Sequence, residues 1–236
     1  EQSGKKHGRF SDMGFEDHVP ADIRSLYEVR DHRHAAAILV GEFSEAATEI
    51  FRCLRAFRFS VEDVTEPGGN ESQIPKKFSE LLRPRGWVEC KLKAERVVDG
   101  RAVSEESHKI DYVKGRVALD LEWNSKDQTF DRDLLAFRAF FEFERISLGI
   151  LVTRSNSLDP WIASLGSYKD KHGTPRTYSQ KYGASTTHMG KLMPRLESGR
   201  GGGCPVLVFG ITPALLDGGI GRLHHVDRLV ELDHAD

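Results

Sequence analysis

The chain has 236 residues, of which 39% are hydrophobic and 30% are charged, and its formal net charge at pH 7 is −2. This composition is typical of a soluble globular protein with one substantial core, and it excludes disordered and fibrous proteins. The longest apolar runs, residues 35–40, 148–152 and 206–211, are far shorter than the ~18 residues that a membrane-spanning helix needs. The near-neutral net charge gives no sign of nucleic-acid binding for the chain as a whole.

The positions of the three cysteines bear on two further features, disulfides and zinc sites. Cys53, Cys90 and Cys204 are widely separated and form no CxxC pair. Neither a disulfide framework nor a zinc site is therefore indicated. Residues 1–12 are polar and lack the apolar centre of a signal peptide. We expect a reducing, cytoplasmic location.

The N-terminal half predicts two helices and a strand. Residues 35–40 read as a short strand or the start of a helix, and apolar residues at helical spacing predict an amphipathic helix over 44–57. After the breaker at 67–70, the spacing of apolar residues over 74–82 predicts a second helix. Residues 87–98 then predict a strand, which leads into the turn signal Asp99-Gly100.

Three carboxylates lie on the next two predicted strands. The apolar runs 110–113 and 117–123 predict a β-hairpin, with Asp111 on its first strand and Asp120 and Glu122 on its second. Because successive side chains of a strand alternate between its two faces, Asp120 and Glu122 point to the same side.

The apolar neighbours on the second strand point the other way, and they are Leu119, Leu121 and Trp123. Carboxylates crowded on one face repel each other and resist loss of water. A divalent cation with oxygen ligands relieves this cost, and Mg²⁺ is the usual ion where the substrate is a phosphate. The hairpin is therefore a candidate metal site, although for an isolated hairpin the solvent face of an edge strand is the favoured explanation of these residues.

The rest of the chain predicts a helix and two further strands. Apolar residues recur at steps of three and four over 134–146, and Asp131 can cap this helix. Residues 150–153 read as a buried strand, which a right-handed crossover places beside the strand of Asp120. Residues 206–210 predict a final core strand. Together the elements predict an α/β fold with a central mixed β-sheet flanked by helices.

The segment 166–200 is locally basic. It carries seven lysine and arginine residues against two acidic ones, and tyrosines are interleaved with them. A basic surface can bind phosphate groups even where acidic residues elsewhere balance the total charge. We expect loops and short helices around a binding surface here.

The ordered set of motifs resembles the PD-(D/E)xK nucleases. It is similar in particular to type II restriction endonucleases of the BglII/BamHI kind, on Asp111, Asp120-Leu121-Glu122-Trp123-Asn124-x-Lys126-Asp127 and Phe130-Asp131-Arg132-Asp133-Leu134. Three outlying motifs match the same family, and they are Pro67-Gly68-Gly69-Asn70, Val152-Thr153-Arg154 and Lys191-Leu192-x-Pro194-Arg195 with Gly201-Gly202-Gly203-Cys204-Pro205. Short acidic motifs arise by chance, so the ordered set carries the resemblance, over roughly residues 35–213.

The resemblance implies a restriction-endonuclease-like core with Asp111, Asp120 and Glu122 as catalytic residues. It implies Mg²⁺ held by Asp111, Asp120 and the backbone carbonyl of Leu121. Glu122 stands where most nucleases of the superfamily have lysine, as in the acidic variant of the BamHI type. It can hold the attacking water or take its proton, and the sequence leaves open one or two metal ions.

The resemblance also implies DNA contacts around this site. Short hydrogen-bonding side chains suit base edges, and cationic ones suit phosphates. The predicted DNA-binding residues are Asn70, Asn124, Lys126, Ser185, Thr186, Thr187, His188, Lys191 and Arg195. We expect a single nuclease domain over residues 1–236, with its catalytic core at about 87–153 and its recognition loops at about 155–203.

The resulting hypothesis is a type II site-specific deoxyribonuclease that hydrolyses double-stranded DNA at a short palindromic sequence and leaves 5′-phosphates. A symmetric site is most simply read by a homodimer, and the resemblance implies a cognate DNA methyltransferase as functional partner. Two alternatives stay open: a structure-specific repair or junction nuclease, and a catalytically inactive sequence-specific DNA-binding protein. A carbohydrate-active enzyme fits poorly, because its paired carboxylates normally face each other across a cleft of about 5 Å or more.

Overall fold

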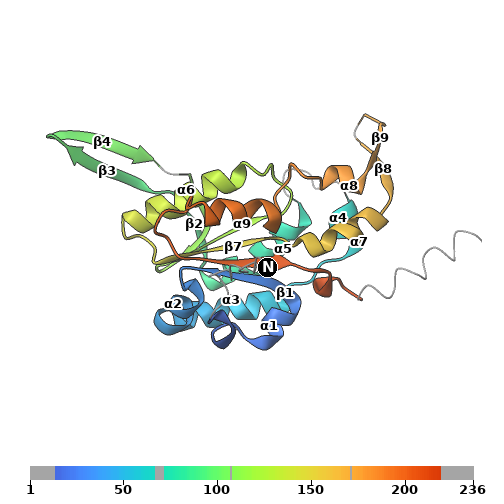
Figure 1. The fold of residues 1–236 in the computed structure, drawn as a ribbon, viewed down its shortest axis with the longest axis horizontal. Helices are drawn as coiled ribbons and strands as arrows, with labels where there is room; N and C mark the ends of the chain where they lie inside the picture. Colours follow the sequence, from blue (N-terminus) through green and yellow to red (C-terminus); the bar gives the residue numbers. More distant parts are fainter. Residues whose placement is uncertain (1–13, 67–71, 107, 171, 219–236) are drawn as a thin grey trace, which may run out of the picture.

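A six-stranded mixed sheet forms the centre of the computed structural model, which describes residues 14–66, 72–106, 108–170 and 172–218. The strand order is β1-β10-β7-β6-β5-β2 (Figure 1). Strands β6, β7 and β10 are parallel, and β1, β5 and β2 pair antiparallel at the two sides. The bounds are β1 (Tyr27–His32), β2 (Val88–Cys90), β5 (Ile110–Lys114), β6 (Val117–Glu122), β7 (Leu148–Arg154) and β10 (Val206–Ile211).

Helices cover both faces of this sheet, which confirms the predicted fold class. In Figure 1, α1, α2 and α3 lie below the sheet, and α6 and α9 lie above it. The helices are α1 (Ala21–Leu26), α2 (Ala35–Glu42), α3 (Ser44–Ala56), α4 (Val61–Thr65), α5 (Gln73–Leu82), α6 (Thr129–Glu142), α7 (Asp159–Ser164), α8 (Tyr178–Lys181) and α9 (Met189–Glu197). Short 3-10 turns are η1 (Phe15–Asp17), η2 (Arg83–Arg85), η3 (Asn156–Leu158) and η4 (Pro213–Leu215).

Two small hairpins extend from this body. One consists of β3 (Lys93–Val98) and β4 (Arg101–Glu106), and the other of β8 (Ser167–Lys169) and β9 (Pro175–Thr177). They lie at opposite ends of the molecule (Figure 1). None of the helices in the described residues has the length and apolar character needed to cross a lipid bilayer.

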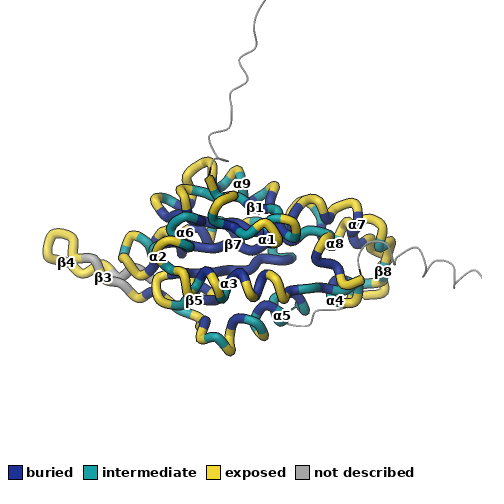
Figure 2. Tube along the Cα trace, turned by 90° about the horizontal axis from the view of Figure 1, so that it is seen from below, coloured by how far each residue is buried: buried dark blue, intermediate teal, exposed yellow. Residues whose placement is uncertain are grey.

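The sheet separates two hydrophobic clusters, one on each face. Along β6, Leu119 and Leu121 belong to the cluster on the α3 side, whereas Ala118 belongs to the cluster on the α6 side. The central strands form the dark buried layer in Figure 2. Because faces alternate along a strand, Asp120 and Glu122 face α6. The predicted separation of these carboxylates from their apolar neighbours is confirmed.

Several predicted elements are confirmed with small shifts in their ends. The hairpin of β5 and β6 pairs Tyr112 with Leu119, and its turn holds Gly115 at φ 58, a left-handed conformation that suits glycine. The helices predicted over 44–57 and 74–82 correspond to α3 and α5. The strand predicted over 150–153 is β7, and it runs parallel to β6 as expected.

The strand predicted over 87–98 was wrong, because the chain forms two strands there in different sheets. β2 pairs with β5 in the central sheet, while β3 pairs with β4 in a separate hairpin. Between them the side chain of Leu92 turns into the cluster on the α6 side. This anchor takes the chain out of the central sheet.

Two further expectations for the chain needed correction. Residues 35–40 are helical, within α2, so of the two interpretations the helix start is confirmed and the strand was wrong. Asp131 does not cap α6: the helix begins at Thr129 with Gln128 at the N-cap position, so Asp131 lies in its first turn. Its carboxylate instead pairs with Arg195 and Arg200, which lie in and just after α9.

Candidate active site

The three predicted catalytic carboxylates meet where β5 and β6 lie side by side. Asp120 and Glu122 are buried, with 3% and 7% of the residue surface exposed. Asp111 lies opposite on β5, and its side chain is exposed. The backbone N–H of Asp111 donates a hydrogen bond of 2.7 Å to Oδ1 of Asp120. One carboxylate at the solvent edge therefore stands next to two that are sunk into the protein.

A fourth carboxylate reaches the same place from α6. Asp133 is 2% exposed, and it lies on the buried face of the helix. The neighbouring Arg132 contacts both carboxylates, with its Nη2 at 3.5 Å from Oε1 of Glu122 and at 3.3 Å from Oδ1 of Asp133. Helix and strand thus place one guanidinium between two buried acids.

Burial makes these acids hard to ionise. It raises the pKa of Asp120 to about 8, helped by the negative charges of Asp111 and Glu122. It raises the pKa of Asp133 to about 9, where Asp120 and Glu122 add to the effect. The pKa of Glu122 is also raised by burial, against hydrogen bonding from Ser125 and the charge of Arg132. Four carboxyl groups this close cannot all be ionised without added positive charge.

The donor atoms fit a hard cation. Oδ2 of Asp120 and Oδ2 of Asp133 are buried and have no hydrogen-bond partner. Such oxygen atoms are costly to bury, and oxygen is the ligand that Mg²⁺ prefers. Across the described ranges, no three His, Cys, Asp or Glu side chains already stand as a finished ligand set. Asp111 is the exposed member of the group, so it is the carboxylate that solvent reaches.

The segment that follows β6 joins the predicted recognition region. The backbone N–H of Asp127 donates to the carbonyl of Ser185 at 3.0 Å, and that of Thr187 donates to the carbonyl of Ser125 at 2.9 Å. Lys126 and Thr186 form an isolated antiparallel bridge between these bonds. The structure thus brings residues 124–127 beside residues 185–187, although about sixty residues of chain separate them.

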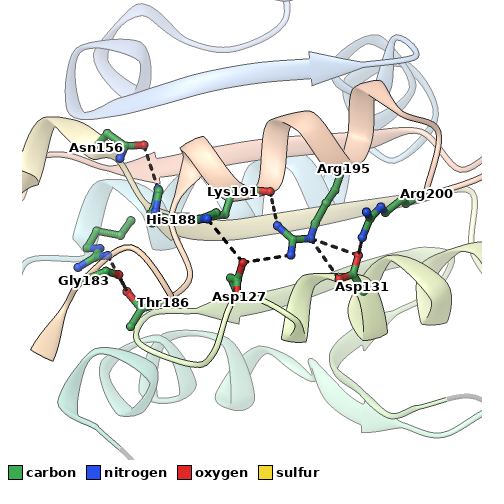
Figure 3. A network of polar contacts seen from close by, with 10 residues as sticks. Asp127, Asp131, Asn156, Gly183, Thr186, His188, Lys191, Arg195 and Arg200 are labelled. Atoms are coloured by element: carbon green, nitrogen blue, oxygen red, sulfur yellow. Dashed lines mark hydrogen bonds and ion pairs between the residues drawn. The ribbon is translucent and has the colours of Figure 1, made fainter. Parts of the chain in front are cut away.

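The predicted cationic residues of α9, Lys191 and Arg195, form ion pairs with acidic residues of this segment and of the start of α6. Lys191 Nζ is 3.9 Å from Oδ2 of Asp127, and Arg195 Nη2 is 3.2 Å from the same oxygen. Arg195 Nε is also 3.2 Å from Oδ1 of Asp131, which binds Arg200 as well (Figure 3). This network ties α9 to the start of α6, and it explains why a locally basic sequence does not give an uncompensated basic surface here.

The short polar residues before α9 have unequal exposure. Ser185 is exposed, whereas Thr187 is fully buried with its Oγ1 unpartnered. Thr186 Oγ1 accepts a hydrogen bond of 3.0 Å from the buried Arg154 and donates one of 2.7 Å to Gly183 (Figure 3). Thr186 is thus held by hydrogen bonds within the protein, and Thr187 is buried in it. Contacts of both residues with DNA stay a prediction.

A cavity lies beside the same loop. Its volume is about 320 Å³, and its lining includes Asn156, Asp159, Tyr182 and His188. His188 Nδ1 is 3.2 Å from Oδ1 of Asn156, a pair drawn in Figure 3. Burial lowers the pKa of His188, so a neutral imidazole is favoured there.

Three predicted DNA-binding residues remain, and they are Asn124, Lys126 and Asn70. Asn124 is half-buried, and its Oδ1 has no hydrogen-bond partner. Lys126 is exposed close by. Asn70 lies outside the described residues.

The structure also adds two residues that sequence reasoning did not select, Arg132 and Asp133. A signal for Asp133 was present in the helical spacing, since it lies three residues after Phe130 and four before Phe137 on the apolar face. A carboxylate in a core position is unusual and marks a candidate functional group.

Comparison with protein families gives a match over this architecture. The family model described as restriction endonuclease BglII/BglIII matches residues 27–211. This range begins with β1 and ends with β10, so it spans the whole central sheet. It also includes the carboxylates of the site and the predicted DNA-binding segments at 124–127 and 185–195. A search of curated proteins gave no match.

Proposed function

Since the chain belongs to the BglII/BglIII restriction endonuclease family and is thus a DNA-cutting hydrolase, we propose that it is a type II site-specific deoxyribonuclease. It hydrolyses phosphodiester bonds of double-stranded DNA at a short palindromic sequence, with Mg²⁺ as cofactor, and leaves 5′-phosphates. We propose that it acts as a homodimer in the cytoplasm, alongside a cognate DNA methyltransferase. A two-fold symmetric dimer suits a palindromic site because each subunit then meets the same half-site.

The observation that carries the proposal is the pairing of Asp111 with Asp120 beside Glu122. Asp120 is buried, its Oδ2 lacks a partner, and its pKa is raised to about 8. Strongly perturbed acids at a family-matched site are typical of catalytic groups. A protein that merely binds DNA gains nothing from burying them together.

The proposed chemistry divides the roles among these residues. Asp111, Asp120 and the backbone carbonyl of Leu121 would hold Mg²⁺, which when bound polarises the phosphoryl oxygen and stabilises the leaving 3′ oxygen. Glu122 orients the attacking water and accepts its proton. Burial raises the pKa of Glu122, and this makes it a stronger base than an exposed carboxylate.

We propose that DNA lies against the surface formed by the loop after β6 and the segment leading into α9. Asn124, Lys126, Ser185 and His188 offer hydrogen-bonding groups at this surface. The other predicted contacts are Asn70, Thr186, Thr187, Lys191 and Arg195. For Lys191 and Arg195, binding to phosphates means exchange of the carboxylate of Asp127 for a DNA anion.

The test is incubation of the purified protein with mixed-sequence phage DNA in Mg²⁺ or in EDTA, followed by sequencing of fragment ends. Asp120→Asn keeps the shape of the side chain and removes its charge. We expect it to slow cleavage by more than about 100-fold, since loss of even outer-shell partners of a metal site costs 10–100-fold. Glu142→Gln, on the exposed part of α6, is the matched control and should cut like the wild type.

Discrete bands in Mg²⁺ with a common palindromic end sequence are expected. Cleavage without a common end sequence would contradict the proposal and favour a structure-specific nuclease. Intact DNA together with sequence-specific binding would also contradict it, and would leave a DNA-binding protein without nuclease activity.

A further inference from the structure

The guanidinium of Arg132 lies at the outer edge of the carboxylate group. Its Nη2 is 3.5 Å from Oε1 of Glu122, and its Nε and Nη2 are both 3.3 Å from Oδ1 of Asp133. These contacts end on one oxygen of each acid. They therefore differ from the two parallel bonds, one to each carboxylate oxygen, that arginine–carboxylate pairs frequently form.

The charge of Arg132 acts on the whole group. It lowers the pKa of Asp111, Asp120, Glu122 and Asp133, each of which burial raises. A DNA phosphate that approaches these acids is itself an anion. Positive charge at the rim is therefore needed to bring the scissile phosphate in as well as to balance the acids.

Arg132 is exposed where its partners are buried. Its side chain is 46% exposed, whereas those of Glu122 and Asp133 are 9% and 2% exposed. The contacts above use Nε and Nη2, and Nη1 takes no part in them. A guanidinium has five N–H donors in a planar fork. Arg132 can therefore face solvent and a phosphate while it still touches the acids.

We propose that Arg132 is a further catalytic residue, which binds a non-bridging oxygen of the scissile phosphate from the start of α6. This inference rests on the proposed nuclease function. The fork of a guanidinium matches two phosphate oxygens, and it holds the diester over Asp111, Asp120 and Glu122. Negative charge on these oxygens grows as the water attacks, so the contact strengthens in the transition state.

The first test measures single-turnover cleavage of a duplex that carries the site found by fragment-end sequencing. Loss of one preorganised donor to a developing anion typically costs about 10²–10³ in rate, and we expect this loss for Arg132→Ala. Arg132→Lys should recover part of the rate, because it restores the charge but not the fork. Arg138→Ala, a change of another exposed arginine on α6, is the control and should leave the rate unchanged.

The second test separates phosphate binding from a structural role. Binding is measured in EDTA with the same duplex, with or without a methylphosphonate that replaces one charged oxygen at the scissile position. We expect the methylphosphonate to weaken wild-type binding about tenfold more than it weakens Arg132→Ala binding. Such coupling arises when the side chain and the oxygen touch, and loss of positioning alone does not produce it.

The outcomes are distinct. If the wild type cuts and Arg132→Ala keeps its rate within threefold, or if both proteins respond equally to the methylphosphonate, the inference fails and the proposed function stands. If the wild type cuts no DNA, the proposed function fails, and the inference fails with it. Should Arg132→Ala not fold, as judged by circular dichroism, the comparison is made with Arg132→Gln, which keeps the length of the stem.

Discussion

At the scale of single residues, the site is defined by acids that the fold buries at a cost. Asp120 faces α6 because strand alternation requires it, and Asp133 faces β6 because helical spacing requires it. The two oxygens without partners, Oδ2 of Asp120 and Oδ2 of Asp133, belong to this meeting of strand and helix. Stability is given up where function needs a charge-binding pocket, as is common at active sites.

This cost makes the stability of the protein depend on pH. The pKa of Asp133 rises from 3.8 to about 9 on folding, so between these values the folded state holds a proton that the unfolded chain has lost. The free energy of unfolding therefore falls as pH rises through this window. Asp133→Asn has no proton to lose, so its melting temperature relative to wild type should increase from pH 5 to pH 9.

The measurement is thermal unfolding of both proteins in EDTA at several pH values. A difference of about 1 kcal/mol corresponds to roughly 2–4 °C for a protein of this size, and we expect at least that change between pH 5 and pH 9. Glu142→Gln on the same helix should show no such trend. A constant or shrinking difference for Asp133→Asn would mean that Asp133 is ionised in the folded protein.

Residue patterns predicted part of this site and missed part of it. Asp111, Asp120 and Glu122 could be grouped because strand alternation and a short hairpin turn fix their neighbours. Arg132 and Asp133 lay within a motif that was noted, yet their contact with Glu122 depends on how α6 packs over β6. The pairing of Arg195 with Asp127 and Asp131 was equally out of reach, because it joins segments that only the tertiary fold brings together.

At the scale of elements, the packing of α6 on β7 holds the site in place. A Cβ added to Gly149 of β7 would lie 2.3 Å from Cδ2 of Phe137, deep in the cluster on the α6 side. Gly149 thus lets the helix approach the sheet closely. That approach brings Asp133 to the carboxylates of β6.

Gly149→Ala should therefore destabilise the protein. Overpacking of a well-packed core typically costs about 1–3 kcal/mol, and we expect the melting temperature to fall by several degrees. Cleavage should fall as well, because a shift of α6 moves Arg132 and Asp133. Gly41→Ala in α2 is the control: apart from its chain neighbours and the backbone of its own helix, no atom lies within 4 Å of the added Cβ, and alanine favours helix by up to about 1 kcal/mol. A melting temperature for Gly149→Ala equal to that of wild type would contradict this account.

Elements were predictable where periodicity was strong and misread where it was weak. The spacing in α3, α5 and α6 predicted helices because each has one clear apolar face. β1 was not predicted, because this antiparallel strand at the side of the sheet has the polar sequence YEVRDH, with little beyond Tyr27 and Val29 to mark it. The break between β2 and β3 depends on the anchor at Leu92, and residues 87–98 carry no turn signal for it.

At the scale of the whole molecule, one sheet contributes residues to both hydrophobic clusters. The cluster on the α3 side and the cluster on the α6 side each include residues from β6, β7 and β10. Unfolding of either cluster would expose one face of these shared strands. The two halves should therefore lose their structure together, which is the expectation for a single domain.

This prediction can be tested by urea unfolding with two probes. Trp87, Trp123 and Trp161 all belong to the cluster on the α3 side, so their fluorescence reports on that half, whereas far-ultraviolet circular dichroism reports on helices of both faces. We expect the two unfolding curves to coincide. Gly149→Ala, which disturbs the α6 side, should shift both curves to lower urea by the same amount. A different outcome for Gly149→Ala is that its fluorescence transition stays in place while its circular dichroism transition shifts to lower urea. The two clusters would then unfold separately, as two cooperative units. A shared sheet transmits the loss of one face to the other only when its strands unfold as one.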